Sequence, residues 1–143
     1  MATEYITLKK MIAIVPQEYI AQAMDDDGEG GADAGVWDEI AEAVADEVEG
    51  PLGLRYSVPF DVPFPKIVRQ AARIFCAEIL YLRRGISGED NPWSVRATSM
   101  RRKLNKIGSG DDPLGPDYDK ETPSGSIISE PSKTYSNQGR LIL

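Results

Sequence analysis

KIVRQAARIFCAEILYLRR, residues Lys66–Arg84, carries apolar side chains on nearly every side of the helix that it predicts. Such a helix has no wide polar face to turn toward water, so other helices must cover it. We therefore expect it in the middle of a bundle. Pro65 suits the first turn of this helix, and Gly85 suits its end. The two final arginines complement the negative pole of the helix dipole.

Two amphipathic helices of opposite charge flank this central helix in the sequence. The first is acidic and begins near Val36; Gly50 and Pro51 are expected to kink or end it, because proline removes a backbone donor. Its apolar stripe contains Trp37, Ile40, Val44 and Val48. The second is basic, with Asn91 as its cap and Gly108 as its end. Its apolar stripe contains Trp93, Ala97, Met100, Leu104 and Ile107.

Shorter elements complete the prediction. Thr7 can cap one short helix and Pro16 can open another before the acidic helix. The segment LRYSVPFDVPFP, residues 54–65, contains three prolines and is expected to run as an extended connector. The predicted fold class is therefore all-α: a small helical bundle of four to five helices followed by a long extended C-terminal arm.

The arm begins where the composition changes after Gly110. Residues 1–110 form the predicted helical domain, whereas residues 111–143 are rich in Pro, Ser, Gly and Asp and show no helical period. A purely solvating tail has no physical need of apolar side chains, yet this one contains them. We expect the arm to become ordered on neighbouring subunits. Its docking residues would be Ile127, Ile128, Leu141, Ile142 and Leu143.

Charge is segregated along the 143 residues, whose net charge is −7. Residues 1–50 carry a net −11, residues 51–110 carry +7, and residues 111–143 carry −3. The acidic and basic halves can pair within one subunit or across neighbouring copies. For pairing between copies, the predicted interface residues are Asp38, Glu42, Asp46, Glu49, Arg96, Arg101, Arg102 and Lys103.

The composition argues against catalysis. The chain has no histidine, so the commonest general base and zinc ligand is absent, and it contains none of the common phosphate-binding, nucleophile-elbow or zincin motifs. Its single cysteine, Cys76, falls in the apolar central helix and is expected to be buried and inert. The sequence also lacks an apolar run long enough to span a membrane and a secretion signal. We expect a non-enzymatic protein without a catalytic cofactor.

One acidic loop resembles a metal-binding pattern. In MDDDGEGGADAGVW, residues 24–37, aligning Gly30 with the sixth position of an EF-hand loop places carboxylates at four ligand positions. These are Asp25, Asp27, Glu29 and Asp33. Position twelve, which should be a bidentate glutamate, is Val36, so any calcium affinity should be weak and in the millimolar range. The alternative is an acidic connector without an ion.

The order of these features resembles the head-tail connector, or adaptor, proteins encoded next to the major head genes in Mu-like phages and prophages. The resemblance covers roughly residues 5–110. It rests on Tyr5 and Leu8, the Asp25–Asp33 loop, the alanines Ala41, Ala43 and Ala45, the LRYSVPF segment with Arg55, Tyr56 and Pro59, the prolines before the central helix, and the ending LNKIGSG.

This resemblance implies a structural virion protein of the neck, at the head-tail junction, assembled in the bacterial host cytoplasm. The resemblance also implies that its copies form a ring of about twelve beneath the portal protein, and head-to-tail contacts that close produce rings of this kind. The ring would join head to tail or neck proteins and extend the channel for double-stranded DNA, without binding DNA specifically. No membrane partner is implied.

Three alternatives remain open at this stage. The chain could be a stopper or tail-completion protein in the same neck. It could be a weak calcium-responsive module, through the acidic loop. It could also be a nucleic-acid-binding helical module, through the basic helix, although an acidic protein with a pI of about 4.6 is atypical of that class.

Overall fold

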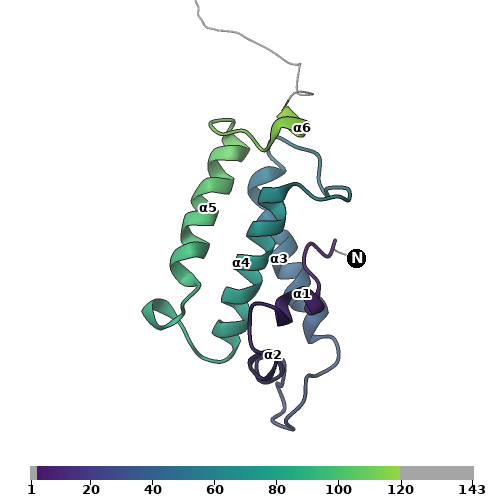
Figure 1. The fold of residues 1–143 in the computed structure, drawn as a ribbon, viewed down its shortest axis with the longest axis vertical. Coiled ribbons are helices and arrows are strands. Elements are labelled where there is room, and N and C mark those ends of the chain that lie inside the picture. Colours follow the sequence, from purple (N-terminus) through teal and green to yellow (C-terminus); the bar gives the residue numbers. More distant parts are fainter. Residues whose placement is uncertain (1–2, 120–143) are drawn as a thin grey trace, which may run out of the picture. The chain divides into compact units, whose positions relative to one another are not determined.

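The computed structural model describes residues 3–119, which are helical and contain no β-strand (Figure 1). The helices are α1 (Leu8–Ile12), α2 (Gln17–Ala23), α3 (Val36–Leu52), α4 (Lys66–Arg83), α5 (Ser94–Ser109) and α6 (Pro116–Asp119), with a 3-10 turn, η1 (Gly88–Asp90), before α5. The predicted all-α class is confirmed. The five apolar residues assigned to the arm lie outside the described residues.

The chain divides into two compact units, Met1–Asp112 and Pro113–Leu143. Unit 1 holds α1 to α5. In unit 2, the described residues contain the four-residue helix α6, which the sequence pattern did not predict. None of the helices in the described part of the chain is both long enough and apolar enough to cross a membrane.

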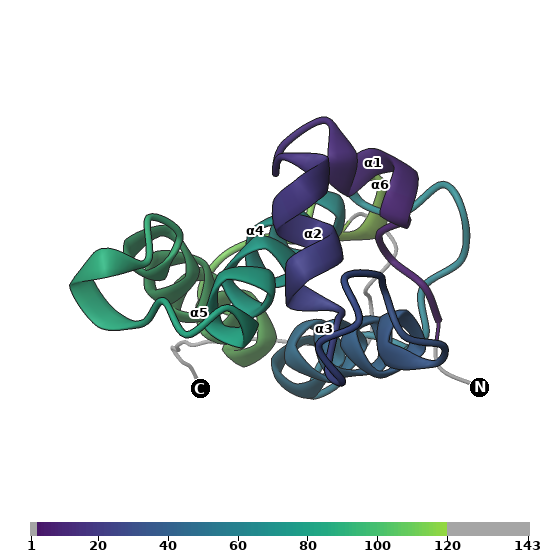
Figure 2. The same ribbon diagram turned by 90° about the horizontal axis from the view of Figure 1, so that it is seen from below.

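Helix α4 is the central element of unit 1. It contacts α1, α2, α3 and α5, which surround it in Figures 1 and 2. Its fully buried side chains include Val68, Phe75 and Cys76. The expectation that other helices cover α4 on every side was too broad, because Lys66, Arg69 and Arg73 are exposed and Leu82 in the last turn is 45% exposed. The central position predicted for this helix is nevertheless the one observed.

Helices α3 and α5 approach each other closely at one end. Gly108 is buried inside α5 and does not end the helix as predicted; α5 continues to Ser109 and ends at Gly110, whose φ of +93° suits glycine. A Cβ atom at Gly108 would lie 2.0 Å from the carbonyl oxygen of Pro51 in α3. The glycine therefore serves helix packing, and Gly110 provides the C-cap.

The start of α5 also differs from the prediction. The helix begins at Ser94, two residues later than predicted, with Trp93 at the N-cap. Asn91 is buried; its side chain accepts a hydrogen bond from the Trp93 N–H at 2.9 Å and donates one to the Glu78 carbonyl at 3.2 Å. Asn91 thus orders the turn before α5 and ties that turn to α4.

Helix α3 begins and ends close to the predicted positions. Val36 is buried and Trp37 is only half-buried, so the apolar stripe starts one residue earlier than predicted. Gly50 and Pro51 lie within the helix, which ends at Leu52. Pro51 lacks an N–H group, and because it lies one residue before the end of the helix, this loss affects only the final turn.

Tyr5 attaches the proline connector to the bundle. The Phe60 N–H donates to the Tyr5 hydroxyl at 3.1 Å, and the same hydroxyl donates to Glu49 of α3. The Tyr5 ring makes edge contacts with Phe60 and Phe64, with ring centroids 6.4 and 4.8 Å away. Burial, reinforced by the bond to Glu49, raises the pKa of Tyr5 above its ordinary value.

Candidate subunit-interaction surfaces

The exposed side of α3 is strongly acidic. We call Asp38, Glu39, Glu42 and Asp46 the acidic face; all four are exposed, and none has a hydrogen-bonding or ion-pair partner among the side chains of residues 3–119. Three of them are among the predicted interface residues, and Glu39 is not. Glu49, also predicted, is instead half-buried and bonded to Tyr5. The acidic face is therefore available to a partner, whereas Glu49 is used within the chain.

Arg101 on α5 is the centre of a partly buried ionic cluster that links α3, α4 and α5. Its guanidinium donates to Glu47 of α3 at 2.8 and 3.0 Å and to Glu78 of α4 at 2.6 Å. Burial alone would lower the pKa of Arg101, but the bonds to both carboxylates outweigh it and raise that pKa. Glu78 is only 7% exposed, and this ion pair with Arg101 compensates the cost of burying a carboxylate. For Arg101, pairing within the subunit is what the structure shows.

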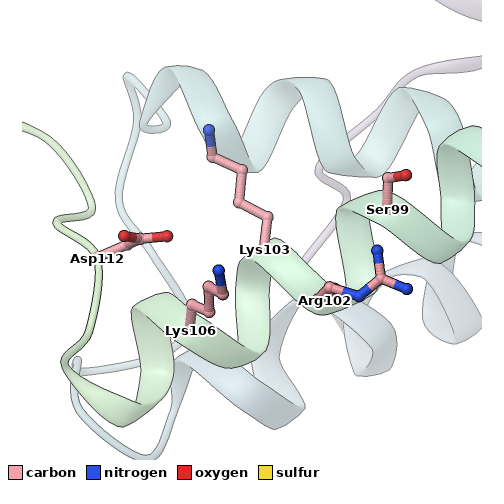
Figure 3. A pocket seen from close by; sticks show the side chains of 5 residues that line it. All are labelled: Ser99, Arg102, Lys103, Lys106 and Asp112. Atoms are coloured by element: carbon pink, nitrogen blue, oxygen red, sulfur yellow. The ribbon is translucent and has the colours of Figure 1, made fainter.

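The exposed side of α5 carries three further bases near its C-terminal end. We call Arg102, Lys103 and Lys106 the basic face; with Ser99 and Asp112 they line an open pocket of about 240 Å³ (Figure 3). The three bases come from α5 and Asp112 from the loop after it, and no carboxylate of the described chain forms a salt bridge with them. Lys106 was not among the predicted interface residues, although its position four residues after Arg102 indicates a shared helix face.

A second hollow, of about 390 Å³, lies where α4, α5 and the turn between α1 and α2 meet. We call it the arginine-rimmed groove. It is lined by Ile14, Gln70, Arg73, Ile74, Trp93, Arg96 and Met100. Arg96 lies over the Trp93 ring at 5.0 Å, and both arginines are exposed. Arg96 was predicted as an interface base, but the sequence pattern did not indicate the groove, because its lining comes from three separate segments.

The acidic loop brings together three of the four predicted metal ligands. Carboxylate oxygens of Asp25, Asp27 and Asp33 lie within 4.8 Å of one another, and Glu29 is not part of the group. The Asp25 carboxylate accepts hydrogen bonds from the N–H groups of Gly30 at 2.7 Å, Gly28 at 2.8 Å and Glu29 at 3.1 Å. These bonds lower the pKa of Asp25, that from Gly30 most.

The other two aspartates make similar bonds. Asp33 accepts from the N–H groups of Asp26 at 2.6 Å and Asp27 at 3.2 Å, and Asp27 accepts from Glu29 at 3.0 Å. The carboxylates therefore close the loop by bonding to its own backbone. Such aspartate-to-backbone bonds are common in turns without any metal.

Basic residues at the end of α4 hold the start of this loop. Arg83 donates to the Ala23 carbonyl at 2.6 Å and pairs with Asp26, while Arg84 bonds to Gln22 at 3.0 Å and stacks on Tyr19. The two arginines were predicted only to complement the helix dipole, and the structure adds a second role. They attach α2 and the loop to the central helix.

Cys76, the single cysteine of the chain, is fully buried on α4. Burial raises the pKa of its thiol from 9.0 to about 12. At neutral pH the thiol is protonated and inaccessible, in agreement with the expected inert core residue.

Comparison with known proteins identifies the family. No curated protein and no solved structure gives a significant match. The family model described as Bacteriophage Mu, Gp36 matches residues 5–128, which is most of the chain. The resemblance to Mu-like phage proteins is therefore confirmed at the level of the family, and the chain belongs to the Bacteriophage Mu Gp36 family.

Proposed function

We propose that this phage protein is a head-tail adaptor of the virion neck, forming a ring below the portal that extends the DNA channel and joins head to tail. The family match supports a phage role, and the helical fold supplies rigid faces for assembly. The protein acts by binding, not by catalysis.

One observation carries this proposal: within residues 3–119, neither the acidic face of α3 nor the basic face of α5 has a salt-bridge partner, although the two helices pack side by side. The one salt bridge between these two helices in the described part of the chain joins Arg101 and Glu47. No salt bridge joins the acidic face to the basic face among the described residues, and both faces are exposed. The acidic face of one copy can meet the basic face of the next. Repeated head-to-tail, such contacts produce a ring.

The ionic contacts would orient the subunits more than hold them together. Each exposed pair contributes only about 0–1 kcal/mol, and salt weakens it. Affinity must come mainly from apolar contacts beside the charged faces. The ionic and apolar contacts have different roles: the charges select the register in which the apolar surfaces meet, and those surfaces supply the affinity.

The test reverses two charges of the basic face, Arg102→Glu with Lys103→Glu, in the full chain. Arg101 stays unchanged, since reversing it would leave Glu78 without a partner inside the bundle. We expect a folded helical monomer that no longer assembles, measured by native mass spectrometry and by complementation of a phage lacking the gene. The matched control is Lys9→Glu with Lys10→Glu, an equal charge change on α1, which should assemble normally.

Imaging decides the location. Labelled chain should appear at the neck of purified virions, and particles made without it should have heads lacking tails. Chain found only with the tail, or bound one layer away from the portal, would instead support the stopper or tail-completion role. Sequence-independent DNA binding by the isolated chain, abolished by the Arg102 and Lys103 reversal, would support the nucleic-acid-binding alternative.

A further inference from the structure

The arginine-rimmed groove is an apolar surface with uncompensated positive charge. Its floor contains Ile74, Trp93 and Met100, all half-buried, and its rim contains Arg73 and Arg96. Neither arginine has a carboxylate partner within residues 3–119. A matching ligand would combine an apolar side chain with a neighbouring carboxylate.

The proline connector of the same chain presents that combination. Val62 is 77% exposed, far more than an apolar side chain in a packed loop, and the adjacent Asp61 is exposed as well. Asp61 has no hydrogen bond or ion pair with any described residue. The bonds that tie Phe60 to Tyr5 hold the connector against the bundle, so the two side chains are displayed on an anchored loop.

The two surfaces lie on different sides of the molecule. In both Figure 1 and Figure 2, α5 lies on the left and the connector between α3 and α4 on the right, with α4 between them. The connector therefore cannot fill the groove of its own chain. Two different surfaces placed this way produce head-to-tail contacts, which close into a ring or continue as a filament.

We propose that Asp61 and Val62 of one copy dock in the arginine-rimmed groove of a second copy, with Val62 against Trp93 and the Asp61 carboxylate between Arg73 and Arg96. This inference rests on the proposed function and identifies the apolar contact that its ring requires. A volume of about 390 Å³ accommodates the two side chains with their backbone. The charge signs match at the rim, and docking of Val62 would bury the half-buried Trp93 ring, which supplies the anchor.

The experiment is a charge swap in the full chain, with self-association measured by sedimentation over a range of concentrations. Arg73→Glu with Arg96→Glu should weaken association by about tenfold or more, as should Asp61→Arg alone. Combining all three substitutions should restore association, because the signs again match. A merely structural role for these residues would not give such recovery. Lys66→Glu with Arg69→Glu, an equal change on exposed α4 residues outside the groove, is the matched control.

A second pair of variants tests the apolar part. Val62→Asp should weaken association, whereas Val95→Asp should not, although Val95 is 79% exposed. Circular dichroism should show that every variant keeps its helical content. A chain that assembles normally with Arg73 and Arg96 reversed, or a swap without recovery, would overturn this inference while leaving the adaptor role intact. A wild-type chain that stays monomeric at every concentration and is absent from virions would overturn both.

A cross-linking experiment separates the possible occupants. Chain carrying Val62→Cys is mixed with chain carrying Met100→Cys, and a short bismaleimide is added. Cross-linked dimers between the two species support the proposal. Cross-links from Met100→Cys to a cysteine placed at Ile128, with none to Val62→Cys, would show that the C-terminal segment occupies the groove and would refute it.

Discussion

Gly108 of α5 faces the carbonyl oxygen of Pro51 in α3 so closely that a Cβ atom there would stand only 2.0 Å from that oxygen. Backbone atoms cannot move aside as a flexible side chain can. Gly108→Ala should therefore force the two helices apart, at a cost of about 2 kcal/mol or more in the free energy of unfolding. Alanine's better helix propensity, worth about 1 kcal/mol, recovers only part of this. Urea denaturation followed by circular dichroism measures the difference.

Gly50 provides the matched control for this prediction. It is also a helical glycine, in the last turns of α3, but a Cβ atom there would meet nothing within 4 Å. Gly50→Ala should stabilise the chain by about 0.5–1 kcal/mol through the unfolded state. Equal effects of the two substitutions would show that the approach of α5 to Pro51 does not limit stability.

Arg101 should be important for stability because Glu78 depends on it. Arg101→Met leaves the Glu78 carboxylate, 7% exposed, without its ionic partner. Breaking a fully buried pair costs about 3–5 kcal/mol, but the Arg101 side chain is 41% exposed, so we expect about 1–3 kcal/mol. The double variant Arg101→Met with Glu78→Gln should recover part of the loss, which a thermodynamic cycle measures.

Arg102→Met tests whether this effect is specific. Arg102 is the neighbouring arginine on α5, is exposed and has no salt-bridge partner among the described residues. Its substitution should change the free energy of unfolding by less than about 0.5 kcal/mol. A comparable loss for both arginines would mean that net charge, and not the Glu78 pairing, sets the cost.

The helices could be predicted because their signals are local. Thr7 caps α1 as expected, accepting from the Lys10 N–H at 3.3 Å, and Pro65 precedes α4. The role of Gly108 could not be predicted, because a glycine near a helix end looks the same whether it caps the helix or admits a neighbouring backbone. Gly110, two residues later, is an equally good C-cap by sequence, and it is the residue that ends α5.

The interaction surfaces were harder to predict, because they depend on which charged side chains are already paired within the subunit. The sequence pattern grouped Arg101 and Arg102 as interface bases, although the first is paired with carboxylates of its own subunit and the second is exposed without a salt bridge among the described residues. Helical periodicity separates faces but does not identify a partner from another helix. The arginine-rimmed groove combines residues from three segments, so no single pattern reveals it.

Cys76 makes stability depend on pH in alkaline solution. The folded chain keeps the thiol proton up to a pKa of about 12, whereas the unfolded chain loses it near 9.0. The unfolded state then binds fewer protons, so stability falls as pH rises above that lower value, by about 1.4 kcal/mol per pH unit. Cys76→Val should remove this part of the decline. Denaturation midpoints of both proteins between pH 8 and roughly 10.5 measure it.

Thiol labelling gives an independent check on Cys76. In the native chain at pH 8, a thiol reagent should react only as fast as the bundle opens, and denaturant should release full reactivity. A cysteine introduced at the exposed position Val95 should react at once without denaturant. Rapid labelling of Cys76 in the native chain would contradict its burial in α4.

Asp25 should order its loop only while it is ionised. Backbone bonds, first from Gly30, lower its pKa from 3.8, so the stabilisation is complete above that value and is lost as pH falls through the lower, folded pKa. Amide exchange at Gly28 and Gly30 should be slow at pH 6 and faster in Asp25→Asn, whose amide is a weaker acceptor. Glu29→Gln should not change it, since the Glu29 side chain makes none of these bonds. Unchanged exchange in Asp25→Asn would refute the role.

Calcium should compete with these bonds instead of adding to them. Both carboxylate oxygens of Asp25 already accept hydrogen bonds from backbone N–H groups, and one oxygen of Asp33 accepts from the N–H groups of Asp26 and Asp27. A calcium ion would have to displace these bonds. It would also lack a bidentate glutamate, because position twelve of the EF-hand pattern is Val36. We expect millimolar calcium to shift the melting temperature equally in the wild type and in Asp25→Ala, with magnesium as the ionic-strength control. A larger shift for the wild type would instead establish a weak calcium site, because only specific ligation by Asp25 distinguishes the two proteins.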